Sequence, residues 1–330
     1  MIRMARLGAF FLFCFAFAPA ARAADKVTFG LDWLAEPEYG GYYQALATGI
    51  YKKYGIDVTI VEGGPQVNTA QMLISGHLTF DITSNSFLAL NFVQEHIPFV
   101  IVGAGFQQDP DALIAHPGQG NDSFAALKGK PIGVSADTRA SWWLFLKSKY
   151  GYTDSQLRPY GYSLAPYFAN KNAIQEAYVT DEPYLIKQKT GHYPVILTLP
   201  DAGFDGYASL VATSEKLVNT DPDLVRRFLQ ASAEGWYSFL YGNPQPAFAA
   251  IEKANPDMTP GLMQYGYDQL KARGIVDSGD TKTLGIYAMT DARWKAFFEQ
   301  MVKAGMYSPT LDYKAGYTLQ FIDKGFGVKK

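Results

Sequence analysis

The chain has 330 residues, of which 48% are hydrophobic, 15% aromatic and 18% charged. This composition excludes disordered, collagenous and low-complexity proteins, because it supplies a large apolar core. The length predicts about two domains or lobes. The formal net charge is −2, and the longest basic runs are dipeptides such as Lys52-Lys53. We therefore expect no nucleic-acid partner, because binding a phosphate backbone requires a basic surface.

The N-terminus has the pattern of a secretory signal peptide. Arg3 and Arg6 precede an apolar stretch at residues 7–18, and Ala21-Arg22-Ala23 places small residues at a cleavage site. The stretch is shorter than the ~20 residues that span a bilayer. We predict that residues 1–23 are removed and that the protein lies in the periplasm, without membrane insertion. Cleavage leaves 307 residues, a formal charge of −5 and no cysteine, because Cys14 is the only one.

From Lys26 onwards, strand-like and helix-like segments alternate. Val27, Phe29, Leu31 and Trp33 alternate as in a strand, and the following apolar residues recur at helical spacing. The expected elements are a helix over 43–54, a strand over 56–61, a short helix ending at 74, a strand over 80–83, a helix over 87–94 and a strand over 99–102. This order predicts an α/β sheet with parallel crossover connections.

A second, smaller α/β unit begins at residues 127–134. Asp137-Thr138 can cap a helix that carries Trp142 and Trp143, and Glu182 can cap a helix that opens at Pro183. Strands are expected near 178–179 and over 195–199. From about residue 208, a strand over 210–212 precedes long amphipathic helices, the longest of which opens at Asp221-Pro222.

Two α/β lobes without a linker imply that the chain crosses between them more than once. We place the crossings near residues 103–112 and 200–208. The first lobe is then discontinuous, with residues 24–105 plus 206–330, and the second lobe comprises residues 106–205.

The sequence holds few candidates for catalysis. Its four histidines (His77, His96, His116 and His192) are not spaced as metal ligands, and there is no metalloprotease, nucleophile-elbow or phosphate-loop motif. We expect no catalytic residue, no metal and no cofactor, which indicates a binding protein rather than an enzyme.

Tyrosine and tryptophan near strand ends are the more informative feature, because ligands of open α/β sheets bind beyond the carboxyl ends of the strands. Flat aromatic walls with a few amide, hydroxyl and carboxylate groups suit a planar, polar heterocycle. The predicted ligand-binding residues are Asp32, Trp33, Tyr39, Ser84, Asn85, Ser86, Arg139, Trp142, Glu182 and Tyr184.

Several of these residues have an equally simple structural interpretation. Trp33 continues the strand alternation and fits the core, whereas Asn85 and Glu182 fit helix caps. Arg139 lies in the first turn of a predicted helix, where a cation opposes the helix dipole, and this favours a ligand role. Trp142 and Trp143 cannot share a helix face, and we assign Trp142 to the cleft. On the C-terminal helices the expected core residues are Phe228, Trp236, Trp294, Phe297 and Phe298.

Ordered motifs over nearly the whole chain after residue 23 resemble the NMT1/THI5-like solute-binding proteins. They are Leu31-Asp32-Trp33, the segments at 41–45 and 49–58, Ser75 to Ile82, Leu127 to Val134, and Thr180-Asp181-Glu182-Pro183-Tyr184. The resemblance implies a periplasmic binding protein of the second type, in which two lobes close on a small ligand. It also implies delivery to a membrane ABC permease with its ATPase, and a monomer.

Relatives in this family carry riboflavin, nitrate, sulfonates and taurine, or the pyrimidine precursors of thiamine. In the pyrimidine-binding branch Asp-Trp is usually followed by Pro-Asn, whereas here Asp32-Trp33 is followed by Leu34-Ala35-Glu36-Pro37-Glu38-Tyr39. The yeast pyrimidine-synthesising relatives use a Cys-rich motif, which the chain after residue 23 lacks.

Three hypotheses result. The first is a non-catalytic receptor for an aromatic heterocycle, with a pyrimidine-type ligand placed before a flavin-type one. In this hypothesis Trp33, Tyr39 and Trp142 stack on the ligand, and Asn85 and Ser86 form hydrogen bonds with it. Glu182 faces an amino-substituted edge of the ring. The second is a receptor for an oxyanion such as an alkylsulfonate or nitrate, held by Arg139 and helix amides. The third is a secreted enzyme that acts on a heterocycle.

Overall fold

The computed structural model describes residues 23–65 and 67–325. The predicted signal peptide, apart from its last residue, lies outside the described residues. Within these two ranges, none of the helices combines the length and the apolar character needed to cross a bilayer.

The first sheet has the strand order β2-β1-β3-β10-β4. Its strands are β1 (Asp25–Gly30), β2 (Ile56–Val61), β3 (Phe80–Asn85), β4 (Phe99–Phe106) and β10 (Ala208–Ser214). β1 runs parallel to β2 and β3, as the alternation of strands and helices predicts. β10 is antiparallel to both β3 and β4, so the first sheet contains one strand from a distant part of the chain.

The second sheet has the order β7-β6-β8-β5-β9. Its strands are β5 (Asp111–Ala115), β6 (Ile132–Val134), β7 (Leu157–Pro159), β8 (Ile174–Tyr178) and β9 (Val195–Thr198). β6 is parallel to β7 and β8, whereas β5 is antiparallel to β8 and β9. The chain passes between the sheets at residues 107–110 and 199–207. We call each sheet with its helices a lobe; the lobe boundaries given above stay a prediction.

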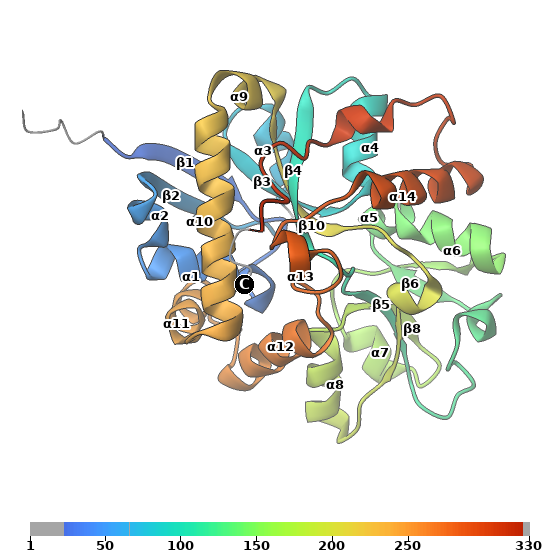
Figure 1. Cartoon of the computed structure of the whole chain (residues 1–330). Helices are drawn as coiled ribbons and strands as arrows, with labels where there is room; N and C mark the ends of the chain where they lie inside the picture. The colour runs from blue at the N-terminus through green and yellow to red at the C-terminus, as the bar shows by residue number, and fades with distance from the viewer. Residues whose placement is uncertain (1–22, 66, 326–330) are drawn as a thin grey trace, which may run out of the picture.

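Helices surround both sheets (Figure 1). They are α1 (Gly40–Ala47), α2 (Ile50–Lys53), α3 (Thr69–Ile74), α4 (Phe87–Gln94), α5 (Ala136–Arg139), α6 (Trp142–Tyr150), α7 (Ala165–Ala169), α8 (Glu182–Thr190), α9 (Glu215–Thr220), α10 (Pro222–Tyr241), α11 (Gln245–Ala254), α12 (Pro260–Ala272), α13 (Thr281–Leu284) and α14 (Asp291–Lys303). The longest is α10, which begins at Pro222 as predicted. The Asp221 carboxylate caps it by accepting the Leu224 N–H at 3.1 Å.

Several predicted boundaries were wrong: β3 and β4 run on to Asn85 and Phe106, β8 ends at Tyr178, and three further boundaries have a clear cause. The first strand ends at Gly30 and not at Trp33, because its partner β2 ends at Val61, opposite Gly30. The helix expected over 43–54 is two helices, α1 and α2, because Gly49 between them has a left-handed φ of 75°. A periodic apolar pattern continues across such a break and conceals it.

The helix predicted to start at Asp137-Thr138 is also two helices. Ser135 is its cap, since the Ser135 hydroxyl accepts the Thr138 N–H at 3.2 Å, and α5 then ends at Arg139. Arg139 therefore lies in the last turn of a short helix and not in the first turn of a long one. The dipole argument for a ligand role of Arg139 fails for that reason.

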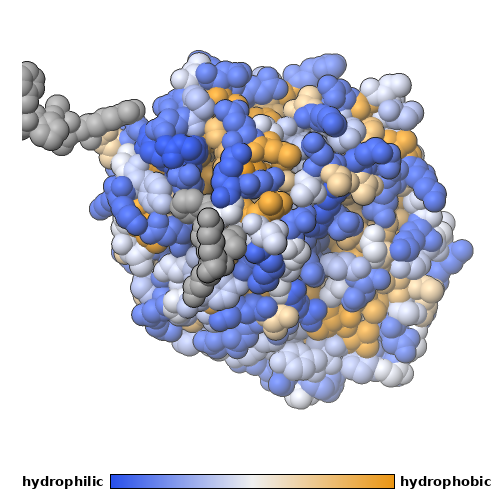
Figure 2. Space-filling view, viewed as in Figure 1, coloured by the Kyte–Doolittle hydropathy of each residue, from blue (hydrophilic) through white to orange (hydrophobic). Residues whose placement is uncertain are grey.

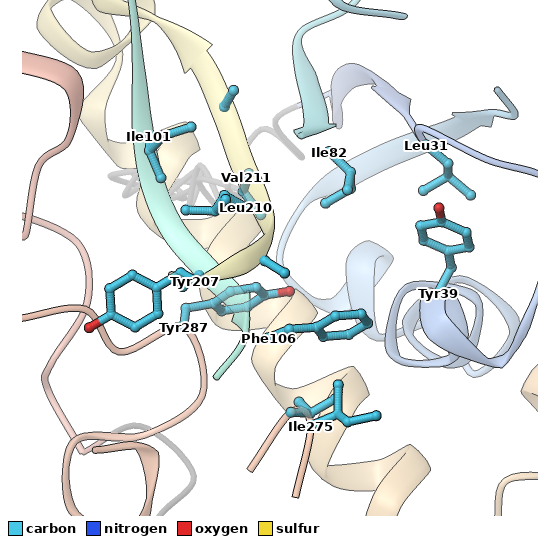
Figure 3. Packing of buried hydrophobic residues seen from close by; sticks show 14 of the residues in the cluster. Leu31, Tyr39, Ile82, Ile101, Phe106, Tyr207, Leu210, Val211, Ile275 and Tyr287 are labelled. Atoms are coloured by element: carbon cyan, nitrogen blue, oxygen red, sulfur yellow. The ribbon is translucent and has the colours of Figure 1, made fainter. Parts of the chain in front are cut away.

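The core of the first lobe is built around aromatic residues. Phe228 of α10 stacks on Phe80 with 4.2 Å between ring centroids and meets the edge of Phe29 at 5.1 Å. The five residues predicted for the core of the C-terminal helices are all buried. Figure 3 shows further buried residues from β3, β4 and β10, among them Ile82, Ile101 and Leu210. Outside the core, hydrophilic residues cover most of the face in Figure 2, and apolar residues form separate patches.

Candidate ligand-binding site

The Asp32 carboxylate binds two other predicted site residues, Tyr39 and Ser84. Asp32 follows β1, and Ser84 belongs to β3, the parallel neighbour of β1, so both lie at the same edge of the sheet. The Tyr39 hydroxyl donates to one carboxylate oxygen of Asp32 at 2.6 Å, and the Ser84 hydroxyl donates to the other at 2.7 Å. Figure 3 shows the Tyr39 hydroxyl pointing toward the segment at Leu31.

The electrostatic surroundings of Asp32 connect it to the second lobe. Burial raises the pKa of Asp32, the hydrogen bonds from Tyr39 and Ser84 oppose this rise, and the negative charge of Asp137 on α5 adds to it. Asp32 therefore faces the start of α5 across the interface between the lobes. This is the place expected for a ligand of an open α/β sheet.

An aromatic contact bridges the lobes next to Asp32. The ring of Trp33 lies 4.5 Å from the ring of Tyr162, centroid to centroid, at an interplanar angle of 48°. Tyr162 has a left-handed φ of 56°, which is unusual for a tyrosine, and its ring lies 5.3 Å from that of Tyr160. At 4.5 Å the Trp33 and Tyr162 rings touch, so no further ring fits between them at this separation.

Glu182 lies on the second-lobe side of the interface. Helix α8 begins at Glu182 itself, with Asp181 at the cap position, so the prediction that Glu182 is the cap was wrong by one residue. The Glu182 carboxylate turns back toward β8, where it accepts the Tyr178 N–H at 2.8 Å and the Tyr160 hydroxyl at 2.9 Å.

Four carboxylates meet where the segment after β1 faces the start of α8. We call Glu36, Glu38, Asp181 and Glu182 the acid cluster. Burial raises the pKa of Glu38 to about 7, and it raises the pKa of Glu182 as well. The pKa values of Glu36 and Asp181 lie well above their usual range, first because of burial and then because the other members of the cluster repel a second negative charge.

Further acidic residues with raised pKa values lie in or next to the second sheet. Burial raises the pKa of Glu176 to about 7 and that of Asp109 to about 6. The Glu176 carboxylate accepts the Ser135 N–H at 2.7 Å. The negative charges of Glu36, Glu38 and Asp32 on one side, and of Glu176, Asp181 and Glu182 on the other, make the interface between the lobes acidic. Even so, no group of three acids, histidines or cysteines among the described residues is arranged to hold a metal ion.

Four of the predicted residues have other surroundings. Ser86 is fully buried and exchanges hydrogen bonds with the Tyr207 backbone. Asn85 accepts the Phe87 N–H at 3.2 Å, but the cap position of α4 is Ser86, so the cap interpretation of Asn85 was wrong by one residue. Trp142 is 1% exposed and donates its indole N–H to Asp111 at 3.1 Å. Arg139 reaches the Val134 carbonyl oxygen at 3.5 Å, and its Nε is buried without a partner among the described residues.

Tyr184 lines a groove separate from the acid cluster. The groove has a volume of about 370 Å³ and lies between α8 and α12, which are neighbours at the bottom of Figure 1. Tyr193 and Tyr265 form its other aromatic walls, and Lys187 and Asp268 supply its charges. Glu182 and Tyr184, two residues apart on α8, therefore face different surroundings.

The tyrosines Tyr160 and Tyr178 and most of the acids at this interface were not among the predicted site residues. Tyr160 directly follows β7 and Tyr178 ends β8, so the rule applied to Trp33 and Ser84, that ligands lie beyond strand ends, would also have found them. Glu36 and Glu38 stood in the segment that departs from the pyrimidine-binding branch. The sequence signal that could have found them is the presence of three acidic residues, Asp32, Glu36 and Glu38, within residues 32–38.

Comparison with known proteins identifies the family. A family model described as NMT1/THI5 like matches residues 36–247. The chain belongs to this family. Riboflavin-binding protein RibY of Chloroflexus aurantiacus is 25% identical over 320 residues, which cover 93% of this chain and 90% of RibY.

Solved structures share the fold. The alkanesulfonate-binding protein SsuA from Xanthomonas axonopodis pv. citri, bound to MOPS, matches with a TM-score of 0.65 and 12% identity over 90% of this chain and 99% of SsuA. The desulfurization enzyme DSZB matches with a TM-score of 0.57 and 12% identity over 90% of this chain and 97% of DSZB. The two-lobed fold of periplasmic binding proteins is thus confirmed, and it occurs in both a binding protein and an enzyme.

Proposed function

We propose that this protein is the periplasmic solute-binding component of an ABC importer and that it carries a small aromatic heterocycle to a membrane permease and its ATPase. The observation that carries the proposal is the meeting of Asp32, Tyr39 and Ser84 at one edge of the first sheet, opposite Tyr160 and Glu182 of the second lobe. Contacts of one ligand with both sides stabilise the closed form.

Two ligands have specific support. The pyrimidine-type thiamine precursor follows from the family resemblance and from the Glu182 carboxylate, which can accept from an amino-substituted ring edge. Riboflavin is supported by RibY, because the similarity to that protein extends over 93% of this chain. We place riboflavin first, because the segment Leu34 to Tyr39 departs from the pyrimidine-binding pattern.

An oxyanion ligand has less support, although structural relatives include a sulfonate-binding protein. Arg139 lies at the end of α5, and the N–H groups of Arg139 and Thr138 are already bonded to Ser135, at 3.3 and 3.2 Å. The carboxylates at the interface also repel an anion. A secreted enzyme has no supporting observation beyond the fold that it shares with DSZB.

The first experiment is native mass spectrometry of protein purified from periplasm, followed by denaturation and an ultraviolet–visible spectrum of the released solute. We expect one molecule of an unchanged aromatic heterocycle per chain. If the purified protein carries no solute, binding is measured instead by titration with riboflavin, followed by flavin fluorescence and by the shift in the melting temperature. A ligand at 100 times its Kd stabilises the folded state by about 2.7 kcal/mol.

Variants at the interface test the placement of the ligand. Trp33→Ala and Glu182→Ala are each expected to weaken binding roughly tenfold, a loss of about 1.4 kcal/mol. Leu34→Ala is the matched control for Trp33→Ala, because Leu34 is the adjacent residue and is exposed. Unchanged affinity in both interface variants contradicts the placement, and turnover of the recovered heterocycle contradicts a pure binding function.

A further inference from the structure

We infer that the acid cluster selects its ligand by charge: the site admits an uncharged or cationic ligand rich in hydrogen-bond donors and rejects the phosphorylated or sulfonated form of the same compound. Glu38 is the residue that sets this selectivity. The inference rests on the proposed function and specifies the class of solute that the receptor carries.

The unusual feature of Glu38 is a buried carboxylate whose hydrogen bonding is incomplete. Glu38 belongs to the short 3-10 helix Pro37–Tyr39 and is 4% exposed. Neither of its two carboxylate oxygens has a well-formed hydrogen bond among the described residues; the buried Thr180 hydroxyl lies close enough to lower the pKa of Glu38 against the effect of burial. A buried polar group normally has a partner, because leaving it without one costs free energy. Thr180 can satisfy at most part of the acceptor capacity of this carboxylate, so its remaining lone pairs indicate a place where ligand donors bind.

Glu38 faces both sides of the interface. The negative charges that repel its carboxylate come from Glu182 on α8 and from Asp32 after β1. Helix α12 approaches closely from a third direction: a Cβ built on Gly266 would lie 2.9 Å from the Pro37 ring and 3.1 Å from the Thr180 carbonyl oxygen. Glu38 thus lies among residues of both lobes, which is where the proposed function places the solute.

Within the described part of the chain, the acid cluster forms no ion pair with a lysine, an arginine or a histidine. None of the ion pairs found among residues 23–65 and 67–325 involves Glu36, Glu38, Asp181 or Glu182. Sites that bind phosphate or sulfonate supply the opposite arrangement, with arginine, lysine or helix amides facing the anion. Hydroxyl, amide or amino donors of an uncharged or cationic ligand satisfy the remaining lone pairs of Glu38, whereas an anionic group adds a further buried negative charge.

The test compares solutes that differ only by a phosphate group. Riboflavin with flavin mononucleotide forms one pair, and 4-amino-5-hydroxymethylpyrimidine with its phosphate ester forms another; ethanesulfonate represents the sulfonates. Binding of each solute to the full-length mature protein is measured by isothermal titration calorimetry. For the pair that binds, we expect the phosphorylated member to bind roughly 100-fold more weakly, because like charges in contact are strongly unfavourable.

Glu38→Gln retains the size of the side chain and removes its charge. We expect this variant to bind the unphosphorylated solute more weakly. We also expect it to reduce the ratio of affinities between the unphosphorylated and the phosphorylated member by roughly tenfold. The matched control is Glu252→Gln on α11, which changes the net charge equally at an exposed position away from the interface. This control separates the local effect of Glu38 from the overall negative charge of the protein.

The outcomes distinguish this inference from the proposed function. Three results would overturn the charge selection and leave the receptor function standing. They are equal or tighter binding of a phosphorylated member, binding of ethanesulfonate, and a difference in affinity within the pair that Glu38→Gln leaves unchanged. If neither member of either pair binds and ethanesulfonate does not bind, the proposed ligand class falls and the inference falls with it.

Discussion

The ionised Glu38 carboxylate opposes folding, because it is buried and has no well-formed hydrogen bond among the described residues. Its pKa is about 7 in the folded protein against 4.5 as the usual value. The folded state therefore binds a proton more tightly than the unfolded state. The resulting stabilisation is fully present below pH 4.5 and is lost as the pH rises to about 7.

We predict that Glu38→Gln raises the melting temperature of the ligand-free protein at pH 8. A gain of about 1–3 kcal/mol corresponds to roughly 2–6 °C for a chain of this size. At pH 5 the wild-type carboxyl is largely protonated, so the gain is expected to become small. Differential scanning calorimetry at both pH values measures the difference, with Glu252→Gln as the control. A gain of equal size at both pH values contradicts this explanation.

A second prediction concerns the hydrogen bond from Tyr39 to Asp32. Tyr39→Phe removes a donor at 2.6 Å from a half-buried carboxylate, and bonds to charged groups contribute about 1.5–3 kcal/mol. We expect lower stability by about that amount in urea unfolding, and weaker ligand binding. Tyr313→Phe is the control, because the Tyr313 hydroxyl donates no hydrogen bond to any described residue. Equal effects of the two substitutions would show that the hydrogen bond to Asp32 is unimportant.

Residues at strand ends could be predicted from the sequence, and residues in irregular segments could not. Asp32 and Ser84 were found because parallel neighbouring strands place their carboxyl ends together. Glu38 was missed as a site residue, because its burial depends on a 3-10 turn and on the approach of α12, neither of which leaves a periodic pattern. Trp142 and Ser86 were selected by the same strand-end rule, but the sequence does not reveal that Asp111 and Tyr207 bond them inside the core.

At the level of elements, the packing of α1 against α10 depends on residues without a side chain. A Cβ on Gly235 of α10 would lie 2.2 Å from the Gly41 carbonyl oxygen, and a Cβ on Gly41 would lie 2.2 Å from the Trp236 ring. Both distances are far below van der Waals contact, so the two helices approach as closely as they do only because these positions are glycine.

We therefore predict that Gly235→Ala destabilises the protein by about 1–3 kcal/mol, the usual cost of an oversized side chain in a packed interior. Urea unfolding measures the loss. Gly161→Ala is the matched control, because a Cβ at Gly161 would have no atom within 4 Å. If Gly235→Ala unfolds at the wild-type urea concentration, the two helices are not held as closely as described.

The order of strands and helices could be predicted because each has its own apolar period. Strand β2, helix α4 and the start of α10 were predicted at the positions observed. The breaks between α1 and α2 and between α5 and α6 were not, because Gly49 and Ser141 act through local backbone geometry that leaves the apolar period intact. The antiparallel direction of β10 depends on the path of the returning chain, which the strand's own residues do not specify.

For the whole molecule, the acid cluster places like charges on opposite sides of the interface between the lobes. Glu36 and Glu38 come from the segment after β1, and Asp181 and Glu182 come from the start of α8. The other ionisable groups coupled electrostatically to these carboxylates are Asp32, Tyr39, Tyr160, Glu176, Tyr178 and Tyr265. We therefore expect ionisation of the cluster to push the lobes apart, and protonation or a bound donor-rich ligand to allow them to close.

We predict that small-angle X-ray scattering of the ligand-free protein gives a larger radius of gyration at pH 8 than at pH 5. The sign follows from the raised pKa of Glu38, which is about 7: at pH 5 Glu38 is largely protonated and the repulsion is weaker, whereas at pH 8 Glu38 is ionised. The double variant Glu38→Gln/Glu182→Gln is expected to reduce the difference. A saturating ligand is expected to abolish it, because its contacts with both lobes favour the closed form at either pH. Two results would contradict this role of the acid cluster. One is a radius of gyration that does not change with pH in the wild type, and the other is a change with pH that is as large in the double variant as in the wild type.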